Sequence, residues 1–200
     1  MSQIIGLVNY GIAGNITSIK RAAEKAGAHV ILVNDNKSLS KADKIILPGV
    51  GSFVDAISEL NNLGIVDSLQ IAAKNKPFLG ICLGMQILAT VGFEFGETKG
   101  LNFIDAEVKK IKCHSEVPHM GFNTIDVIKS NPLLKGLDGL EFYFMHSFEM
   151  VNYTNVSALT NYHGHKIVSA INKDNIYGVQ FHPEKSREPG IELFKNFLAI

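Results

Sequence analysis

The first half of the chain alternates short apolar runs with longer segments whose apolar residues recur at helical spacing. A short apolar run bounded by polar or turn residues predicts a buried strand, whereas helical spacing predicts a helix with one buried face. The predicted strands are residues 4–9, 30–33, 44–47 and 77–81. The predicted helices are residues 15–26, 53–60 and 65–73, and Gly27 is typical of a residue that ends a helix. This βαβ alternation indicates a mostly parallel sheet with helices on both faces.

The second half of the chain is rich in strand and turn patterns. Strands are predicted at residues 107–112, 123–128, 141–145, 156–161 and 166–172, and an amphipathic helix at residues 191–198. No repeat, low-complexity tract or linker divides the sequence, and 200 residues with 46% hydrophobic content can bury one substantial core. We therefore expect one domain spanning residues 1–200. Its fold class would be α/β, with a mostly parallel central sheet flanked by helices and a strand-rich second half.

Composition and charge argue against several functional classes. The 19 acidic and 19 basic residues give a net charge of zero, so the chain has no excess of basic residues that would favour binding to nucleic acid or an anionic membrane. No apolar run reaches membrane-spanning length, and the N-terminus has no secretory leader pattern. Two cysteines suit a reducing cytoplasm better than a disulfide framework. His29, His114, His163 and His165 show no ligand-like spacing with acids or cysteines, so we expect neither a metal nor a cofactor.

Cys82 lies between Gly80 and Gly84, at the junction of a predicted strand and a helix predicted over residues 83–90. The two glycines would let the backbone fold back tightly, as it does around the serine of Gly-x-Ser-x-Gly turns. The helix N-terminus would favour the thiolate and could hold an oxyanion. The pattern therefore predicts a nucleophile. The alternative is a buried structural cysteine beside two glycines that pack against a helix.

A base for this nucleophile is available near the other end of the chain, where an apolar run ends in His182-Pro183-Glu184. His182 and Glu184 are two positions apart, so in an extended segment both side chains would point to the same side. A carboxylate there would hold the imidazole in the tautomer that takes a proton from a thiol. Alone, His182 would more often be an ordinary structural or surface histidine. Together with the cysteine turn, it favours a catalytic pair that the fold brings together.

Two segments, residues 80–86 (GICLGMQ) and 178–186 (GVQFHPEKS), resemble the class I glutamine amidotransferases. Two further segments, residues 48–53 (PGVGSF) and 118–123 (PHMGFN), make the sequence most similar to the glutaminase subunit of imidazole glycerol phosphate synthase. The resemblance runs essentially from end to end, and it implies a flavodoxin-like α/β fold for the whole chain.

The resemblance also implies roles for individual residues. The catalytic triad would be Cys82 as nucleophile, His182 as base and Glu184 as the acid that orients the base. The oxyanion loop would be Gly49, Val50 and Gly51, acting with the peptide N–H of Leu83; its alternative is a plain strand-to-helix turn. The residues that bind glutamine would be Gln86, Glu94 and Ser147. The residues that contact a partner would be Asn15, beside Gly14, together with Phe122 and Lys185.

The implied reaction is hydrolysis of L-glutamine to glutamate and ammonia. Free ammonia is a poor product to release, because at neutral pH water protonates it and removes its nucleophilicity. A partner that receives the ammonia through a channel is therefore expected. In this family the partner is a (β/α)₈-barrel cyclase, which uses the ammonia to make imidazole glycerol phosphate and an aminoimidazole carboxamide ribotide in histidine biosynthesis. The resemblance thus implies a cytoplasmic heterodimer.

Three departures from the family pattern keep other functions open. Residues 9–15 begin with Asn where Asp is usual and hold one extra residue, Phe122 stands where Trp is frequent, and Arg187 follows Ser186 in place of Gln. One alternative is a paralogous glutaminase subunit that feeds ammonia to a sugar amidotransferase in bacterial surface-polysaccharide synthesis. Further alternatives are a catalytically silent member of the fold, which the intact triad weighs against, and a peptidase-like relative.

Overall fold

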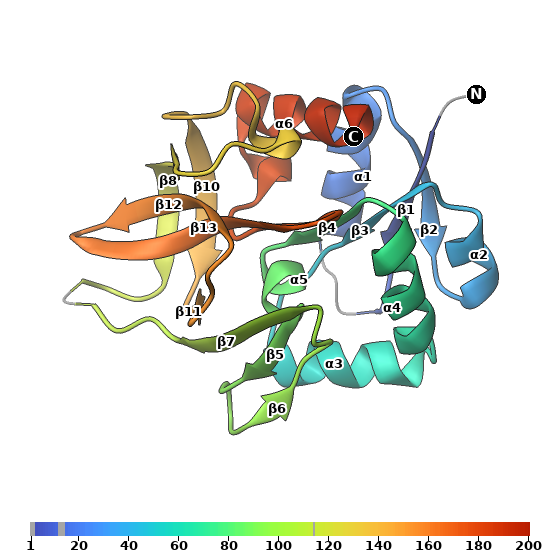
Figure 1. The fold of residues 1–200 in the computed structure, drawn as a ribbon, viewed down its shortest axis with the longest axis horizontal. Helices are drawn as coiled ribbons and strands as arrows, with labels where there is room; N and C mark the ends of the chain where they lie inside the picture. Colours follow the sequence, from blue (N-terminus) through green and yellow to red (C-terminus); the bar gives the residue numbers. More distant parts are fainter. Residues whose placement is uncertain (1–2, 12–14, 114) are drawn as a thin grey trace.

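A mixed eight-stranded sheet forms the centre of the computed structural model, which describes residues 3–11, 15–113 and 115–200 (Figure 1). Its strand order is β2-β1-β3-β4-β14-β13-β12-β9. The strands are β1 (Ile4–Val8), β2 (His29–Val33), β3 (Lys44–Leu47), β4 (Phe78–Ile81), β9 (Asp126–Val127), β12 (Val156–Tyr162), β13 (His165–Lys173) and β14 (Ile176–Val179). Neighbours from β2 to β14 pair in parallel, and β13, β12 and β9 continue the sheet antiparallel. The mostly parallel centre predicted from the sequence is confirmed.

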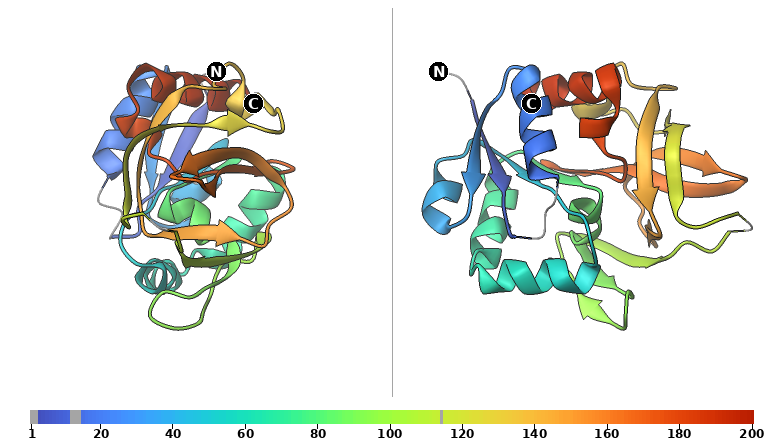
Figure 2. Two further views of the ribbon diagram at one scale, coloured as in Figure 1. Left: turned by 90° about the vertical axis from the view of Figure 1, so that its left-hand side faces the viewer. Right: turned by 180° about the vertical axis from the view of Figure 1, so that it is seen from behind.

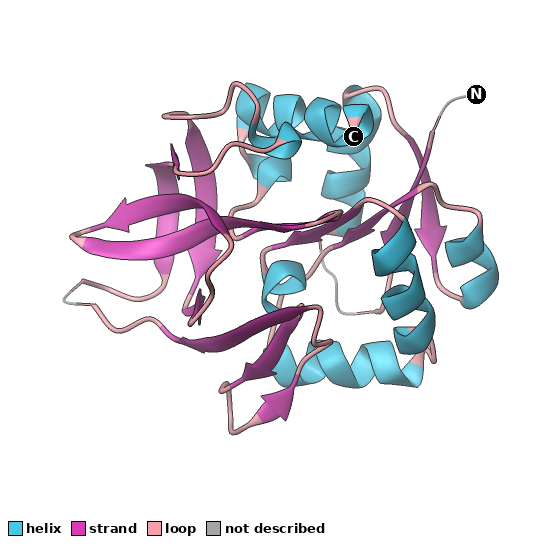
Figure 3. Ribbon diagram, viewed as in Figure 1, coloured by secondary structure: helices cyan, strands magenta, loops and turns pink. Residues whose placement is uncertain are grey.

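Helices cover both faces of the parallel part of this sheet. One face carries α1 (Ile16–Lys25) and α6 (Arg187–Ala199), the other carries α3 (Phe53–Asn62) and α4 (Val66–Asn75), and α2 (Asn36–Ser40) lies beside β2 at the sheet edge. Figure 3 shows that the helices gather around this part, whereas the opposite end of the molecule is built of strands. None of the helices in the described ranges combines the length and the apolar character that a membrane crossing needs.

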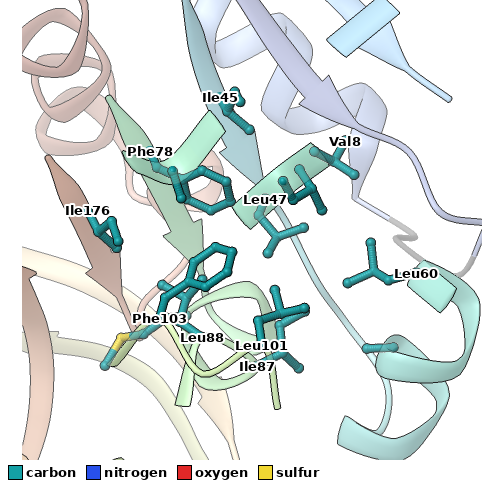
Figure 4. Close-up of a cluster of buried hydrophobic side chains, with 14 of the residues drawn as sticks. Val8, Ile45, Leu47, Leu60, Phe78, Ile87, Leu88, Leu101, Phe103 and Ile176 are labelled. Carbon is teal, nitrogen blue, oxygen red and sulfur yellow. The ribbon is translucent and has the colours of Figure 1, made fainter. Parts of the chain in front are cut away.

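The two faces of the sheet bury two separate hydrophobic cores. In β1, Leu7 packs with α1 and α6, whereas the next residue, Val8, packs with α3 on the other side. In β4, Phe78 and Leu79 divide in the same way. Figure 4 shows the α3 side, where Phe78 and Phe103 meet edge to face with ring centroids 5.5 Å apart. Successive side chains of a strand point to opposite faces of the sheet, so a strand between two cores needs apolar residues at nearly every position.

Two smaller sheets complete the fold: one extends from β13 to α3, and the other lies beside β12 (Figure 2). One sheet has the order β11-β7-β5-β6, and the other pairs β10 with β8. Their strands are β5 (Ala89–Gly92), β6 (Thr98–Lys99), β7 (Ile104–Lys110), β8 (His119–Thr124), β10 (Glu141–His146) and β11 (Phe148–Val151). The remaining short elements are α5 (Leu83–Gln86) and the 3₁₀ turns η1 (Pro132–Leu134) and η2 (Pro183–Lys185).

The helix predicted over residues 83–90 is too long. Helix α5 ends at Gln86, and the chain turns into β5, which pairs in parallel with β7. Tertiary pairing with a strand that follows later in the sequence overrides the local helical pattern here. The pattern also missed α2, β5, β6 and β11, and the strand predicted over 123–128 divides into the end of β8 and the separate β9.

Candidate active site

Cys82 occupies a strained turn between β4 and α5. Its backbone angles, φ 54° and ψ −113°, lie where residues other than glycine are rarely found. A Cβ on Gly84 would lie 1.9 Å from the carbonyl oxygen of Leu47, and a Cβ on Gly80 would lie 2.7 Å from the carbonyl oxygen of Gly84. The prediction that both glycines allow the backbone to fold back is therefore confirmed. The turn presents Cys82 at the carboxyl end of the sheet, with its helix starting at the next residue.

His182 and Glu184 form a buried pair, although for a reason that differs from the one predicted. Nδ1 of His182 lies 2.8 Å from Oε1 of Glu184, and both side chains are fully buried. The segment is not an extended strand, because β14 ends at Val179 and the 3₁₀ turn η2 begins at Pro183. The turn, rather than strand alternation, places the carboxylate beside Nδ1 of the ring. The peptide N–H of His182 donates to Tyr143, which anchors the histidine to β10.

The surroundings of His182 favour its protonated form. Burial by itself lowers the pKa of His182, but its interactions with Cys82, and then with Glu184, outweigh burial and raise that pKa to about 10. At neutral pH the imidazole of His182 therefore carries a proton on both ring nitrogens. Glu184 holds Nδ1 of His182, so the buried Nε2 is the nitrogen that remains to serve Cys82 or a bound substrate.

Cys82 and His182 line one cavity of about 320 Å³. Its wall also holds six residues predicted for substrate or oxyanion binding, which are Val50, Gly51, Leu83, Gln86, Glu94 and Ser147. Together with Cys82 and His182, these residues come from five separate segments of the chain, so the fold brings them to a single site. A group of three side chains that could hold a metal does not occur anywhere in residues 3–11, 15–113 and 115–200.

Residues 7–200 match the family model described as glutamine amidotransferase class-I. The chain belongs to this family. The imidazole glycerol phosphate synthase subunit HisH 1 of Campylobacter jejuni (strain RM1221) is 42% identical over 202 residues, covering 98% of this chain and 100% of that protein. The subunit HisH 2 of Methanococcus maripaludis is 43% identical over 202 residues, covering 98% of each chain. The solved structure of PurLQS from Thermotoga maritima shares the fold, with a TM-score of 0.81 and 19% identity over 100% of this chain and 99% of that one.

Of the three residues predicted for the oxyanion loop, two line the cavity and one packs behind it. Val50 and Gly51 line the cavity, and Gly51 has a positive φ of 95°. Gly49 instead lies behind the wall, because a Cβ there would come within 2.8 Å of the backbone nitrogen of Gly84.

Tyr10 supports this loop, since its hydroxyl donates to the carbonyl of Pro48 over 2.8 Å. Burial, and secondly the charge of Cys82, raises the pKa of Tyr10, so this hydroxyl stays neutral and keeps its proton. The sequence analysis did not find Tyr10, since a tyrosine near the N-terminus carries no signal of its own.

The three residues predicted to bind glutamine are held by different contacts. Gln86 donates from Nε2 to the carbonyl of Phe148, over 2.8 Å. Glu94 accepts the peptide N–H of Phe53 at the start of α3, over 2.8 Å, through one carboxylate oxygen. Ser147 lies in the turn between β10 and β11. All three line the cavity that Cys82 and His182 share.

Two of the residues predicted to contact a partner form one surface cluster with two residues that the sequence analysis had not selected. Nζ of Lys185 lies 5.4 Å from the ring centroid of Tyr143, and the guanidinium of Arg187 lies 4.4 Å from that of Phe122. The rings of Phe122 and Tyr143 meet edge to face, with centroids 5.5 Å apart. This aromatic–cation cluster, Phe122, Tyr143, Lys185 and Arg187, lies beside the His182-Pro183-Glu184 turn.

Asn15 has a different environment from the one expected for a partner contact. Its side chain is buried, and Nδ2 donates to Oε1 of Glu184 over 2.7 Å. The same carboxylate oxygen therefore accepts from both Asn15 and His182. Asn15 lies behind the triad rather than on an exposed face, because α1 begins at the next residue and packs against η2. Gly14, predicted together with it, lies outside the described residues.

Proposed function

We propose that this chain is the glutaminase subunit of imidazole glycerol phosphate synthase. It would hydrolyse L-glutamine and deliver the ammonia to a cyclase that makes imidazole glycerol phosphate in histidine biosynthesis. The observation that carries the proposal is the arrangement of Cys82, His182 and Glu184 around one cavity, in a chain 42% identical to a protein named as that subunit over its whole length. The cytoplasm is the expected location, since that is where the pathway's enzymes would meet their metabolites.

The geometry supports a two-step reaction. The thiolate of Cys82 attacks the side-chain amide carbon of glutamine, which forms a tetrahedral oxyanion. The peptide N–H of Leu83, together with one from Val50 or Gly51, would stabilise that oxyanion. The imidazolium of His182 gives its Nε2 proton to the leaving nitrogen, and ammonia departs from a γ-glutamyl thioester.

Neutral His182 then takes a proton from water, which attacks the thioester and releases glutamate and the thiolate. Glu184 stays ionised throughout and holds the Nδ1 proton of His182, which keeps Nε2 toward the substrate. Gln86, Ser147 and one oxygen of Glu94 would bind the amino-acid end of glutamine. The Glu94 carboxylate suits the α-ammonium group, because their charges are opposite.

A (β/α)₈-barrel cyclase is the partner that this proposal implies, as a heterodimer. The aromatic–cation cluster is the surface on which we expect this partner to dock, since arginine and aromatic side chains are enriched at protein interfaces. It also lies close to the triad, so docking could enclose the path by which ammonia leaves without meeting bulk water.

The experiment that tests the proposal is reconstitution with the cyclase of the same organism. The mixture should form imidazole glycerol phosphate from glutamine, whereas Cys82→Ala should form it only from added ammonium salt. If glutamine hydrolysis is activated only by a sugar-amidating synthetase, the assignment to histidine biosynthesis fails and the paralogous function stands. If a glutamine-mimicking diazo-ketone labels no residue, the glutaminase assignment itself fails.

A further inference from the structure

A chain of buried hydrogen bonds connects the wall of the cavity with the sulfur of Cys82. Nε2 of Gln86 lies 2.8 Å from the carbonyl oxygen of Phe148 and 2.9 Å from Oε1 of Gln180. Nε2 of Gln180 lies 3.6 Å from Sγ of Cys82. Gln180 is fully buried and Gln86 nearly so. The triad mechanism described above makes no use of Gln180.

The direction of this chain follows from its first member. A backbone carbonyl can only accept, so the NH₂ group of Gln86 must face Phe148. Reversing Gln86 would set its oxygen against the oxygen of Phe148. The same NH₂ group faces Gln180, which must therefore present its oxygen to Gln86. The only remaining polar group of Gln180 is its NH₂, and it points at the sulfur of Cys82.

Two chemical consequences follow from this direction. An amide N–H that donates to sulfur stabilises the thiolate over the thiol, because the hydrogen bond is stronger when the acceptor is charged. Both hydrogens of the Gln86 amide are also occupied, so Oε1 is the group that Gln86 has left for a ligand in the cavity. That oxygen suits a donor such as the α-ammonium group of an amino acid.

We propose that Gln180 is a catalytic residue of glutamine hydrolysis that donates a hydrogen bond to Sγ of Cys82 and fixes the orientation of the substrate-binding Gln86. This inference rests on the proposed function for its substrate. The part that concerns sulfur is independent of glutamine, because any small electrophile reports the reactivity of the thiolate.

Three variants separate the two roles. Gln180→Glu keeps the oxygen that faces Gln86 and replaces the N–H donor to sulfur with a second oxygen. Gln180→Leu removes both contacts. Ser169→Ala is the matched control, since the Ser169 carbonyl accepts the peptide N–H of Gln180, while its buried hydroxyl makes no hydrogen bond within the described ranges. All variants carry Cys113→Ser, so that Cys82 is the one thiol measured.

The first measurement is the rate of iodoacetamide alkylation of Cys82 as a function of pH, followed by mass spectrometry. Both Gln180 variants should raise the pH midpoint of alkylation by about one unit, the size expected for losing a hydrogen bond to a charged group. The second measurement is steady-state glutamine hydrolysis. Gln180→Glu should lower kcat about 10- to 100-fold with a small change in KM, whereas Gln180→Leu should also raise KM, because Gln86 loses its anchor.

An unchanged alkylation profile and unchanged kcat in Gln180→Glu would overturn the proposal. Because that variant is nearly isosteric, it remains a test even if Gln180→Leu fails to fold. A loss of the same size in Ser169→Ala would equally refute it, since the effect would then be general loosening around the site. If the unsubstituted protein alkylates normally but hydrolyses no glutamine with its cyclase, the proposed function fails and the sulfur contact is still decided by the alkylation profile.

Discussion

Gly84 is the position where the structure makes the sharpest prediction, because the nucleophile turn and the oxyanion loop touch there. A Cβ on Gly84 would lie 1.9 Å from the carbonyl oxygen of Leu47 and 3.0 Å from the carbonyl carbon of Pro48. Ordinary van der Waals contact begins at 3.4 Å, so in Gly84→Ala the two segments must separate by about 1.5 Å. Such overpacking costs about 1–3 kcal/mol of folding free energy.

The larger effect of Gly84→Ala should be on catalysis. The separation moves Cys82, which precedes α5, away from Val50 and Gly51, which follow Leu47 and Pro48. A misplacement of about 1 Å can cost about 100-fold in rate when nucleophile and oxyanion donors must both meet one carbonyl. We therefore expect kcat/KM for glutamine to fall about 100-fold or more, measured on the fraction that circular dichroism shows to be folded.

Gly100→Ala is the matched control for this prediction. A Cβ there would lie 2.1 Å from the carbonyl oxygen of Ala89, a clash of nearly equal severity, but between segments that do not line the cavity. Gly100→Ala should lose comparable stability in urea unfolding while its folded fraction keeps near-normal turnover. Equal losses of kcat/KM in the two variants would refute the reasoning, and so would wild-type turnover in Gly84→Ala.

Three further predictions concern the triad, the partner and pH. Cys82→Ala should lose glutamine turnover by several orders of magnitude, yet leave the cyclase running on ammonium salt, and residual glutamine turnover near the original rate would contradict the mechanism. The isolated chain should hydrolyse glutamine slowly and accelerate when the cyclase binds, which a glutamate-release assay with and without cyclase measures; full activity alone would argue against this. Burial, followed by the charge of His163, lowers the pKa of His119 to about 4, and burial lowers that of His146 to about 3. Because the unfolded chain takes up these protons near pH 6.5, stability should fall as the pH drops below that value. His146 alone would account for about 2 kcal/mol at pH 5, and urea unfolding that gives equal stability at pH 7 and pH 5 would contradict this.

The parts of the site that depend on local sequence could be predicted. The strained turn at Cys82 needs two glycines within the same seven residues, and the strand before it is recognised as a short apolar run. The contact between His182 and Glu184 was expected because they lie two residues apart, but the 3₁₀ turn that produces it was not. A proline at the first position of that turn is compatible with both conformations, so the sequence left the choice open.

The parts that depend on long-range contacts could not be predicted in the same way. Helix α5 stops after Gln86 because β5 finds a partner in β7, and nothing within residues 83–90 indicates that partner. Asn15 contacts Glu184 across 169 residues of sequence, so its burial beside the triad depends on how α1 packs against η2. Gln180 lies inside a recognisable motif, two residues before His182. Its function becomes visible only when the Phe148 carbonyl fixes the orientation of Gln86.

The carbonyl of Phe148 also joins the nucleophile to the strand that carries Phe122. Nδ1 of His146 lies 2.8 Å from this oxygen and must donate to it, so Nε2 of His146 is an acceptor. His119 lies 3.1 Å from that nitrogen and must donate from Nδ1, which leaves its own Nε2 to accept from Asn123 over 3.4 Å. Both rings have to be neutral for this order to hold, and burial lowers the pKa of His119 to about 4 and that of His146 to about 3. Asn123 and Phe122 are adjacent on β8, and the chain of donors from that strand ends on the same oxygen that orients Gln86. If a partner displaces β8, the effect would therefore reach the groups around Cys82 through this one carbonyl.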